Sequence, residues 1–227
     1  MFKRTILFCI FCTVCLNATL GFTQVHLRPG ISGGFVYSSF RYDDTPDFWD
    51  PGWRGGFAGG VFLEISLKRT ISIVPGVGYL RLADHRDITF PVTVINPYAI
   101  FGEAELSQDY ITIPVLLKVK PVRSTGLFLT VGSEIGILIS ANGQSTLITE
   151  IAPDSVLIVT EDEDVSDGLR STNVFGNIGL GFEQALGIHK VIGEIRYQFG
   201  LVGNGKRGRW LTDWKTQAVL FLAGFAW

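Results

Sequence analysis

Hydrophobic and polar residues alternate along most of this chain with a period of two. The clearest example is 110–120, where one face is aliphatic and the other is mixed. Because successive side chains of a strand point to opposite faces, this pattern predicts strands with one large apolar face. The aliphatic face of this segment comprises Ile111, Ile113, Val115, Leu117 and Val119.

Eight segments of this kind follow one another, and the connections between them are alternately long and short. The segments are 28–40, 54–68, 71–82, 103–120, 126–141, 170–185, 190–202 and 216–227, and the long connections are 41–53, 83–102, 142–169 and 203–211. Barrels of the bacterial outer membrane have short turns on one side and long loops on the other. Soluble eight-stranded barrels place their apolar side chains inside instead. The pattern therefore predicts an all-β fold, an eight-stranded antiparallel up-and-down transmembrane β-barrel over residues 25–227.

The last segment, 216–227, reads TQAVLFLAGFAW and ends on an aromatic residue. In a strand, Phe221, Phe225 and Trp227 share one face, opposite mostly small residues. Outer-membrane barrels commonly end in this way, and their assembly machinery reads such an end. Phe225 and Trp227 are therefore the predicted assembly signal. A buried last strand of a soluble sandwich would show the same local pattern.

Residues 1–24 have the features of a secretory signal peptide, with cleavage expected between 18 and 24. Lys3 and Arg4 precede an apolar run over 6–16, which is shorter than the roughly 20 residues of a membrane-spanning helix. All three cysteines lie in this run, so no disulfide is expected in the exported protein. A lipid anchor at Cys15 is disfavoured because Val14 precedes it. The predicted location is the cell outer membrane of a Gram-negative bacterium.

Composition narrows the function further. The chain has 27 glycines, is 47% hydrophobic and has a formal net charge of −2, so no electrostatic field points to nucleic acid. The motif G-x-G-x-x-G at 203–208 is not followed by a helical pattern, which excludes the nucleotide-binding interpretation. His26, His85 and His189 lie in unrelated segments. We therefore expect no catalytic site, no metal site and no cofactor.

Taken together, the strand segments resemble the PorT-like family of small bacterial outer-membrane β-barrels. The resemblance covers nearly the whole exported chain and rests on the order and spacing of short motifs. It implies an eight-stranded outer-membrane barrel, and some members look like accessory parts of a protein-secretion system. No binding or catalytic residue can be carried over. The matching stretches are Gly33–Gly34, GFAGGVFLEISL at 56–67, IPVLLKVK at 113–120, GSEIGILI at 132–139, FGNIGLGFEQ at 175–184 and EIRYQFGL at 194–201.

Charged residues on the polar faces of the predicted strands point into the barrel. A charge in a narrow interior must be paired or hydrated, because burying an isolated ion is very unfavourable. A network of paired charges that fills the lumen is the favoured interpretation, and a gated ion path or proton relay is the alternative. The predicted network comprises Glu64, Lys118, Glu134, Glu183, Glu194 and Arg196.

Two predicted outer loops carry charge. The acidic run Glu161–Asp164, with Asp154 and Asp167, is expected to be a solvated loop, with calcium binding as the alternative. A basic loop beside Trp210 and Trp214 is a candidate contact for lipopolysaccharide phosphates, or else a plain basic loop. Its cations are Lys206, Arg207 and Arg209.

The sequence thus favours a non-enzymatic outer-membrane barrel with a structural or interaction role in the cell envelope, alone or as an accessory part of a larger envelope or secretion complex. The expected partners are outer-membrane lipid and lipopolysaccharide, the barrel assembly machinery, and envelope proteins that meet the outer loops. A small solute channel or transporter is the first alternative, and a membrane-embedded hydrolase is the second.

The assembly signal can be tested with Trp227→Ala. If Trp227 is read during assembly, this substitution should lower the amount of folded barrel in outer membranes. Refolding of the purified chain into detergent should suffer less, because no assembly machinery takes part there. Heat-modifiable gel mobility of membrane fractions measures the first effect. Equal membrane levels of variant and wild type would contradict the assignment.

Overall fold

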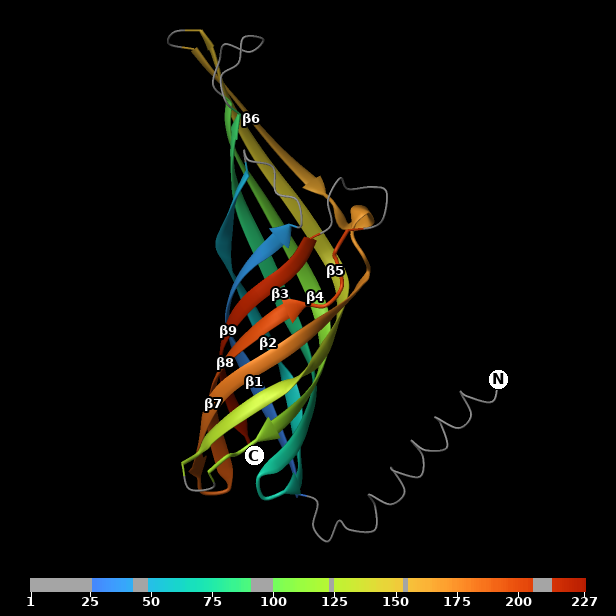
Figure 1. Ribbon diagram of the computed structural model, residues 1–227, viewed down its shortest axis with the longest axis vertical. Coiled ribbons are helices and arrows are strands. Elements are labelled where there is room, and N and C mark those ends of the chain that lie inside the picture. The colour runs from blue at the N-terminus through green and yellow to red at the C-terminus, as the bar shows by residue number, and fades with distance from the viewer. Residues whose placement is uncertain (1–25, 43–48, 91–99, 123–124, 153–154, 206–213) are drawn as a thin grey trace, which may run out of the picture.

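The computed structural model describes residues 26–42, 49–90, 100–122, 125–152, 155–205 and 214–227 (Figure 1). Its elements are almost all strands. No helix in this part of the chain is long and apolar enough to cross a membrane. The elements are β1 (His26–Tyr42), β2 (Trp49–Lys68), β3 (Ile71–Phe90), β4 (Ile100–Val119), β5 (Leu127–Ala152), β6 (Ser155–Asp164), the 3₁₀ turn η1 (Ser166–Gly168), β7 (Thr172–Leu186), β8 (His189–Gly200) and β9 (Trp214–Ala226).

Eight of these strands close into an antiparallel barrel. Each pairs with its neighbours along the chain, except that β5 pairs with β4 and β7, and β1 closes the ring against β9. The remaining strand, β6, pairs only with the outer half of β5 and lies outside the ring. The predicted eight-stranded up-and-down barrel is therefore confirmed, with one additional strand.

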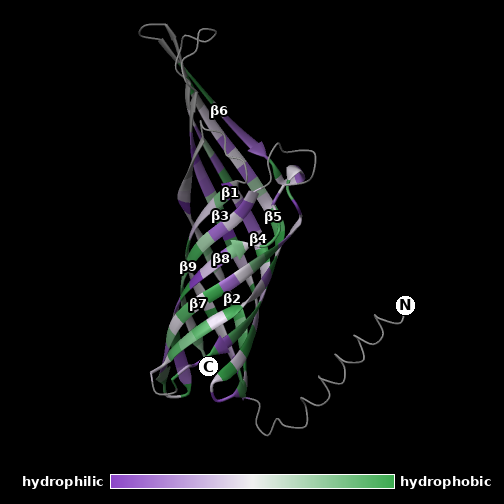
Figure 2. Cartoon of the chain, in the orientation of Figure 1, coloured by the Kyte–Doolittle hydropathy of each residue, from purple (hydrophilic) through white to green (hydrophobic). Residues whose placement is uncertain are grey.

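The two faces of each barrel strand have the predicted polarity. On β4, Ile111, Ile113 and Val115 are 38–50% exposed, whereas Tyr110 and Lys118 are at most 4% exposed. Figure 2 shows that hydrophobic residues concentrate around the lower part of the barrel and become sparse above it. An outward apolar band with polar residues inside is the arrangement of a barrel in lipid.

Aromatic rings mark both edges of the apolar band. At the upper edge the Tyr37 and Trp53 rings stack with centroids 5.4 Å apart, and at the lower edge Phe225 and Trp227 lie 6.3 Å apart. The short turns and the C-terminal end of the chain lie at the lower end (Figure 1). In outer-membrane barrels that end faces the periplasm, so the upper end is extracellular.

On one side the barrel wall continues far above the apolar band (Figure 1). This part, here called the extracellular wall, consists of 49–54, 81–90, 100–109 and 140–152 of β2 to β5, together with β6. The predicted loops 41–53, 83–102 and 142–169 are therefore largely wrong, because strands enter all three of them. Both faces of the wall lie outside lipid, so its sequence has no continuous apolar face that marks it as strand.

The wall departs from the cylinder at a pair of register shifts. One lies between Trp53 and Ala58 of β2, and the other lies between Asp109 and Tyr110, where β4 meets β5. Ala58 pairs with Leu80 of β3, and Tyr110 pairs with the same residue from the other side. Bulges increase local twist and bend a strand. Two shifts at one level therefore turn the upper half of the sheet away from the closed ring.

Candidate functional site

The lower lumen holds a compact layer of ion pairs. Glu64 and Glu183 each lie within 4.0 Å of three lysines, and both carboxylates are less than 10% exposed. Lys118 Nζ also lies 4.3 Å from the centre of the Phe128 ring. Shared contacts of this kind compensate the burial of every charge in the layer. The lysines are Lys118, Lys120 and Lys190.

A second polar layer lies further up the lumen. Arg196 donates to both carboxylate oxygens of Glu194, through Nε at 3.0 Å and Nη2 at 2.9 Å. Asn177 Nδ2 and Gln198 Nε2 donate to Glu134 Oε2 at 3.2 and 3.0 Å. Among the described residues, Glu134 has no cation within 4.0 Å, so amide donors satisfy this buried carboxylate.

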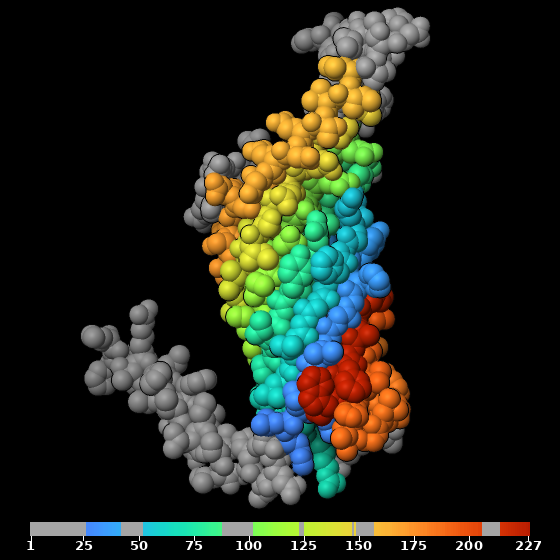
Figure 3. All heavy atoms as spheres, turned by 180° about the vertical axis from the view of Figure 1, so that it is seen from behind, coloured from blue at the N-terminus to red at the C-terminus, as the bar shows by residue number. Residues whose placement is uncertain are grey.

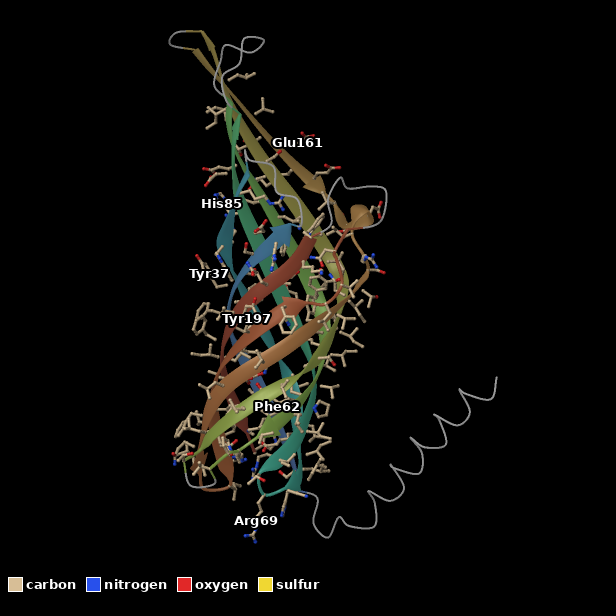
Figure 4. All side chains as sticks on the ribbon, in the orientation of Figure 1. Tyr37, Phe62, Arg69, His85, Glu161 and Tyr197 are labelled. Carbon is tan, nitrogen blue, oxygen red and sulfur yellow. The ribbon has the colours of Figure 1, made fainter. Side chains whose placement is uncertain are left out.

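An internal cavity of about 100 Å³ lies beside these two layers and is lined by Glu64, Lys118, Glu134, Glu194 and Arg196, among others. Its polar lining and size suit a few ordered water molecules. Figure 4 shows Phe62 in this lower part of the barrel. The Phe128 ring fills the space above Gly181, where a Cβ atom would collide with it. The Phe128 ring therefore narrows the lumen beside the cavity.

Above the cavity, aromatic and amide side chains close the lumen. Tyr110 and Phe175 meet edge to face with ring centroids 5.7 Å apart, and both are at most 1% exposed. Asn173 Nδ2 donates to Tyr110 Oη at 3.0 Å and to Asn204 Oδ1 at 2.6 Å. Asn204 comes from the segment after β8 and donates to Thr216 Oγ1 at 2.9 Å. The extracellular mouth is thus sealed by a connected hydrogen-bond network.

All six residues of the predicted charge network lie inside the barrel, but they form two layers. Glu64, Lys118 and Glu183 belong to the lower layer, and Glu134, Glu194 and Arg196 belong to the upper one. Lys120 and Lys190 also belong to the lower layer, although they are not among the six predicted residues. Strand parity could have identified both, because Lys120 shares its face with Lys118, and Lys190 shares its face with Glu194.

The sequence profile of one family, described as outer membrane protein beta-barrel domain, matches residues 18–204. The chain belongs to this outer-membrane barrel family. The protein is accordingly an outer-membrane β-barrel located in the cell outer membrane. No curated protein matches the chain.

Solved structures of small outer-membrane proteins are similar to this barrel. The attachment invasion locus protein Ail of Yersinia pestis, solved with the heparin analogue sucrose octasulfate, is 12% identical, covers 89% of this chain and 99% of its own, and has a TM-score of 0.40. OprG of Pseudomonas aeruginosa is 11% identical over 90% of this chain and 97% of its own, with a TM-score of 0.39. The protease OmpT of Escherichia coli is 8% identical, covers 88% of this chain and 96% of its own, and has a TM-score of 0.38.

The acidic run Glu161–Asp164 lies in β6, so the predicted solvated loop is wrong for these residues. Successive carboxylates of a strand point to opposite faces, so these four cannot converge on one calcium ion. The backbone N–H of Ser166 donates to Asp164 Oδ1 at 2.9 Å. The Ser166 hydroxyl and this N–H hold the pKa of Asp164 below its usual range. Asp167 lies in η1.

Several sequence predictions fall outside the described residues. These are the signal peptide 1–24, Asp154 of the acidic segment, and the basic loop residues Lys206, Arg207 and Arg209. The residues of the predicted assembly signal are described. Phe225 and Trp227 point outward at the lower edge of the apolar band, and Trp227 N–H donates to Pro29 O at 3.0 Å.

The inner face of the extracellular wall carries a buried ion pair above the apolar band. Arg86 Nε donates to Asp84 Oδ2 at 2.8 Å, and Asp84 Oδ1 accepts from Phe40 N–H at 3.1 Å. Burial raises the pKa of the Asp84 carboxyl, and the hydrogen bonds from Phe40 and Ser39 oppose that rise. Burial lowers the pKa of Arg86 to about 10. The pair anchors the base of the wall to the end of β1.

The outer face of the wall is hollowed by a polar groove of about 630 Å³. Arg54 and Arg81 line one side, and Asp162 and Asp164 of β6 line the other. This groove lies directly above the aromatic residues of the upper edge. Figure 3 shows the opposite side of the molecule from Figure 1, with β1 and β9 side by side along the cylinder. The groove thus combines cations of β2 and β3 with carboxylates of β6.

The contribution of the lumen charges to stability can be measured with Arg196→Ala. This change leaves Glu194 buried without its cation, and removing one partner of a buried pair typically costs about 3–5 kcal/mol. Arg69→Ala, at the exposed turn between β2 and β3 (Figure 4), is the matched control and should change stability by less than about 0.5 kcal/mol. Urea unfolding of the refolded barrels gives both values. Equal small effects would show that the pair is solvated.

Proposed function

We propose that this outer-membrane barrel does not transport solutes and is not an enzyme, and that its extracellular wall binds another component of the cell envelope. The observation that carries the proposal is the contrast between the two ends of the β5–β6 pair. Near the barrel β6 carries the exposed carboxylates of Glu161–Asp164, whereas further out it exposes apolar side chains on an edge without a partner in the described structure.

The exposed edge belongs to β6. Leu157, Ile158 and Val159 are 49–63% exposed, and they lie beyond the end of the membrane-spanning cylinder. β6 ends the strand order, so its second edge has no partner in the described structure. Unpaired edges of this kind accept an added strand from another chain. We therefore favour an extended segment of an envelope protein as the occupant of this edge.

Charge on β6 restricts the partner further. The apolar residues are followed directly by Glu161–Asp164, all exposed (Figure 4 labels Glu161). An added strand with a short apolar stretch and neighbouring lysine or arginine residues would complement both parts. This partner fits the role of an accessory part of an envelope or secretion complex, as the narrower resemblance to PorT-like barrels implies.

Lipopolysaccharide and the barrel assembly machinery complete the proposed partners. Trp227 and Phe225 are exposed where assembly factors would read the last strand, which supports the barrel assembly machinery as a partner. Arg54 and Arg81 lie just above the upper aromatic residues, at the height of the lipid headgroups, which supports lipopolysaccharide as a partner. Lys206, Arg207 and Arg209 remain the contacts that the sequence predicts.

A channel is the second candidate function, favoured only by the cavity beside Glu134 and Arg196. Eight strands make a cylinder that side chains can fill, and Tyr110, Phe128 and Phe175 obstruct it. We therefore favour a closed lumen. Among the described residues, no nucleophile lies beside a base in a way that would favour a hydrolase.

Conductance distinguishes the closed barrel from the channel. Because buried rings and ion pairs obstruct the lumen at several levels, the purified barrel should give no steady open channel in planar bilayers. Heat-modifiable migration of the same sample verifies that it is folded. Stable conductance would contradict the proposal, and a change in ion selectivity on Glu134→Gln would then assign the current to this lumen.

Site-specific crosslinking tests the proposed interaction surface. A photo-crosslinking residue at Ile158 on β6 should give a discrete adduct in intact cells. The same residue at Ile188, which is also an exposed isoleucine but lies in the periplasmic turn, is the matched control. Replacing Glu161 and Glu163 with lysine should reduce the Ile158 adduct at least severalfold if the partner is basic. An absent adduct, or one that these changes leave intact, contradicts the proposal.

A further inference from the structure

Four polar side chains form a square on the outer face of the extracellular wall. His85 and Asp87 are two residues apart on β3, and they pair directly with Glu105 and Glu103 of β4. Paired residues point to the same face of a sheet, and so do residues two apart on one strand. Figure 4 shows His85 at this height on the wall, well above the barrel's lower layers.

Three members of this square lie close enough together for their side chains to reach one metal ion. His85 Nε2 lies 3.4 Å from Asp87 Oδ1, and ligand atoms of His85, Asp87 and Glu103 all lie within 4.8 Å of one another. With metal–ligand bonds of about 2.0–2.2 Å, neighbouring ligands of a tetrahedral zinc ion are roughly 3.3–3.6 Å apart. Small rotations of the two exposed carboxylates would bring all three donors to that spacing.

The second nitrogen of the imidazole lies near a carboxylate, on the side away from the other two candidate ligands. His85 Nδ1 faces Glu105 Oε1 at 3.6 Å, and Arg54 forms an ion pair with the same carboxylate oxygen. Metal-ligating histidines almost always direct their other ring nitrogen to a carboxylate, carbonyl or water. Nδ1 is buried without a hydrogen-bond partner among the described residues, with Glu105 as its nearest carboxylate, and Nε2 lies toward Asp87.

The charge of the square is unbalanced as it stands. Asp87 and Glu103 are directly opposite on neighbouring strands, an arrangement that is destabilising for like charges. With Glu105 they make three negative charges, against the single positive charge of Arg54, when His85 is neutral. The remaining two negative charges equal the charge of one divalent cation. The lumen carboxylates differ, because lysine, arginine or amide donors satisfy each of them.

We infer that His85, Asp87 and Glu103 form a binding site for a divalent transition-metal ion of the Zn²⁺ type on the extracellular wall. One imidazole nitrogen and two carboxylate oxygens are a ligand set that zinc accepts, and a water molecule would fill the fourth position. Calcium is disfavoured because it prefers six to eight oxygen ligands and no imidazole. A bound ion would join β3 to β4 where the wall stands free of the barrel.

The test uses the untagged full-length barrel purified from outer membranes in detergent, with zinc ion alone as the probe. Titration calorimetry after chelator treatment should show close to one Zn²⁺ per barrel. His85→Ala should weaken binding at least about tenfold, and Asp87→Asn and Glu103→Gln should each do the same. Zn²⁺ should also raise the urea midpoint of the wild type and leave that of His85→Ala unchanged.

The controls are the other two histidines of the chain, His26 at the start of β1 and His189 beside the lower turn. Substituting either with alanine should leave zinc binding intact, and heat-modifiable mobility verifies that every variant is folded. Zinc binding that survives His85→Ala, or that is lost only with His26 or His189, would overturn the assignment. Equal binding of Ca²⁺ and Zn²⁺, unaffected by His85→Ala, would indicate carboxylates alone and would likewise overturn it.

Discussion

The backbone hydrogen bond imposes the constraint on which the rest of this structure depends. Hydrocarbon offers no partner to an unpaired N–H or C=O group, so a sheet in lipid must close on itself. Here closure requires the last strand, because β9 pairs with β1 over Trp214–Ala226 and with β8 on its other side. The cylinder is incomplete until the end of the chain is in place. An outward aromatic face on that strand is therefore available only when the barrel has its full complement of strands.

Closure with eight strands leaves a lumen too narrow for bulk water, and the interior chemistry follows from that width. Inward carboxylates cannot remain hydrated, so each is held by cations or by amide donors. Glu64 and Glu183 share three lysines, whereas Glu134 relies on Asn177 and Gln198. The Phe128 ring then fills space beside Lys118 of the lower layer, and the Tyr110 ring fills space above the upper layer. Stability and obstruction of the lumen come from the same side chains.

The part of the fold in contact with lipid could be predicted from sequence because lipid makes the pattern simple. Residues such as Ile111, Ile113 and Val115 must face outward, and the parity of each strand then places Lys118 and Glu134 inside. Parity alone does not give pairing between strands, so it could not separate the charges into two layers. Strand parity also does not predict the contact between Lys190 of β8 and Glu64 of β2, which are 126 residues apart in the sequence. Those contacts depend on the register of closure.

The same reasoning explains why the extracellular wall could not be predicted. Above the apolar band neither face of β3 and β4 meets lipid, and the residues 83–90 and 100–109 therefore lack a continuous apolar face. His85-x-Asp87 and Glu103-x-Glu105 do alternate with period two, but a polar alternation is easily taken for a loop. Only the β3–β4 register, which pairs His85 with Glu105, brings the four side chains together.

Freedom from lipid also changes what the wall can do. Within the cylinder every edge must be paired and every charge compensated, which leaves little that a partner or ion could bind. Above it, β6 has one edge without a strand partner in the described part of the chain, and Asp87 and Glu103 lie opposite each other on neighbouring strands. Unsatisfied hydrogen-bonding groups and unbalanced charge are tolerable only where water reaches them. In the function that we propose, the wall is the binding surface and the closed cylinder holds it at the cell surface.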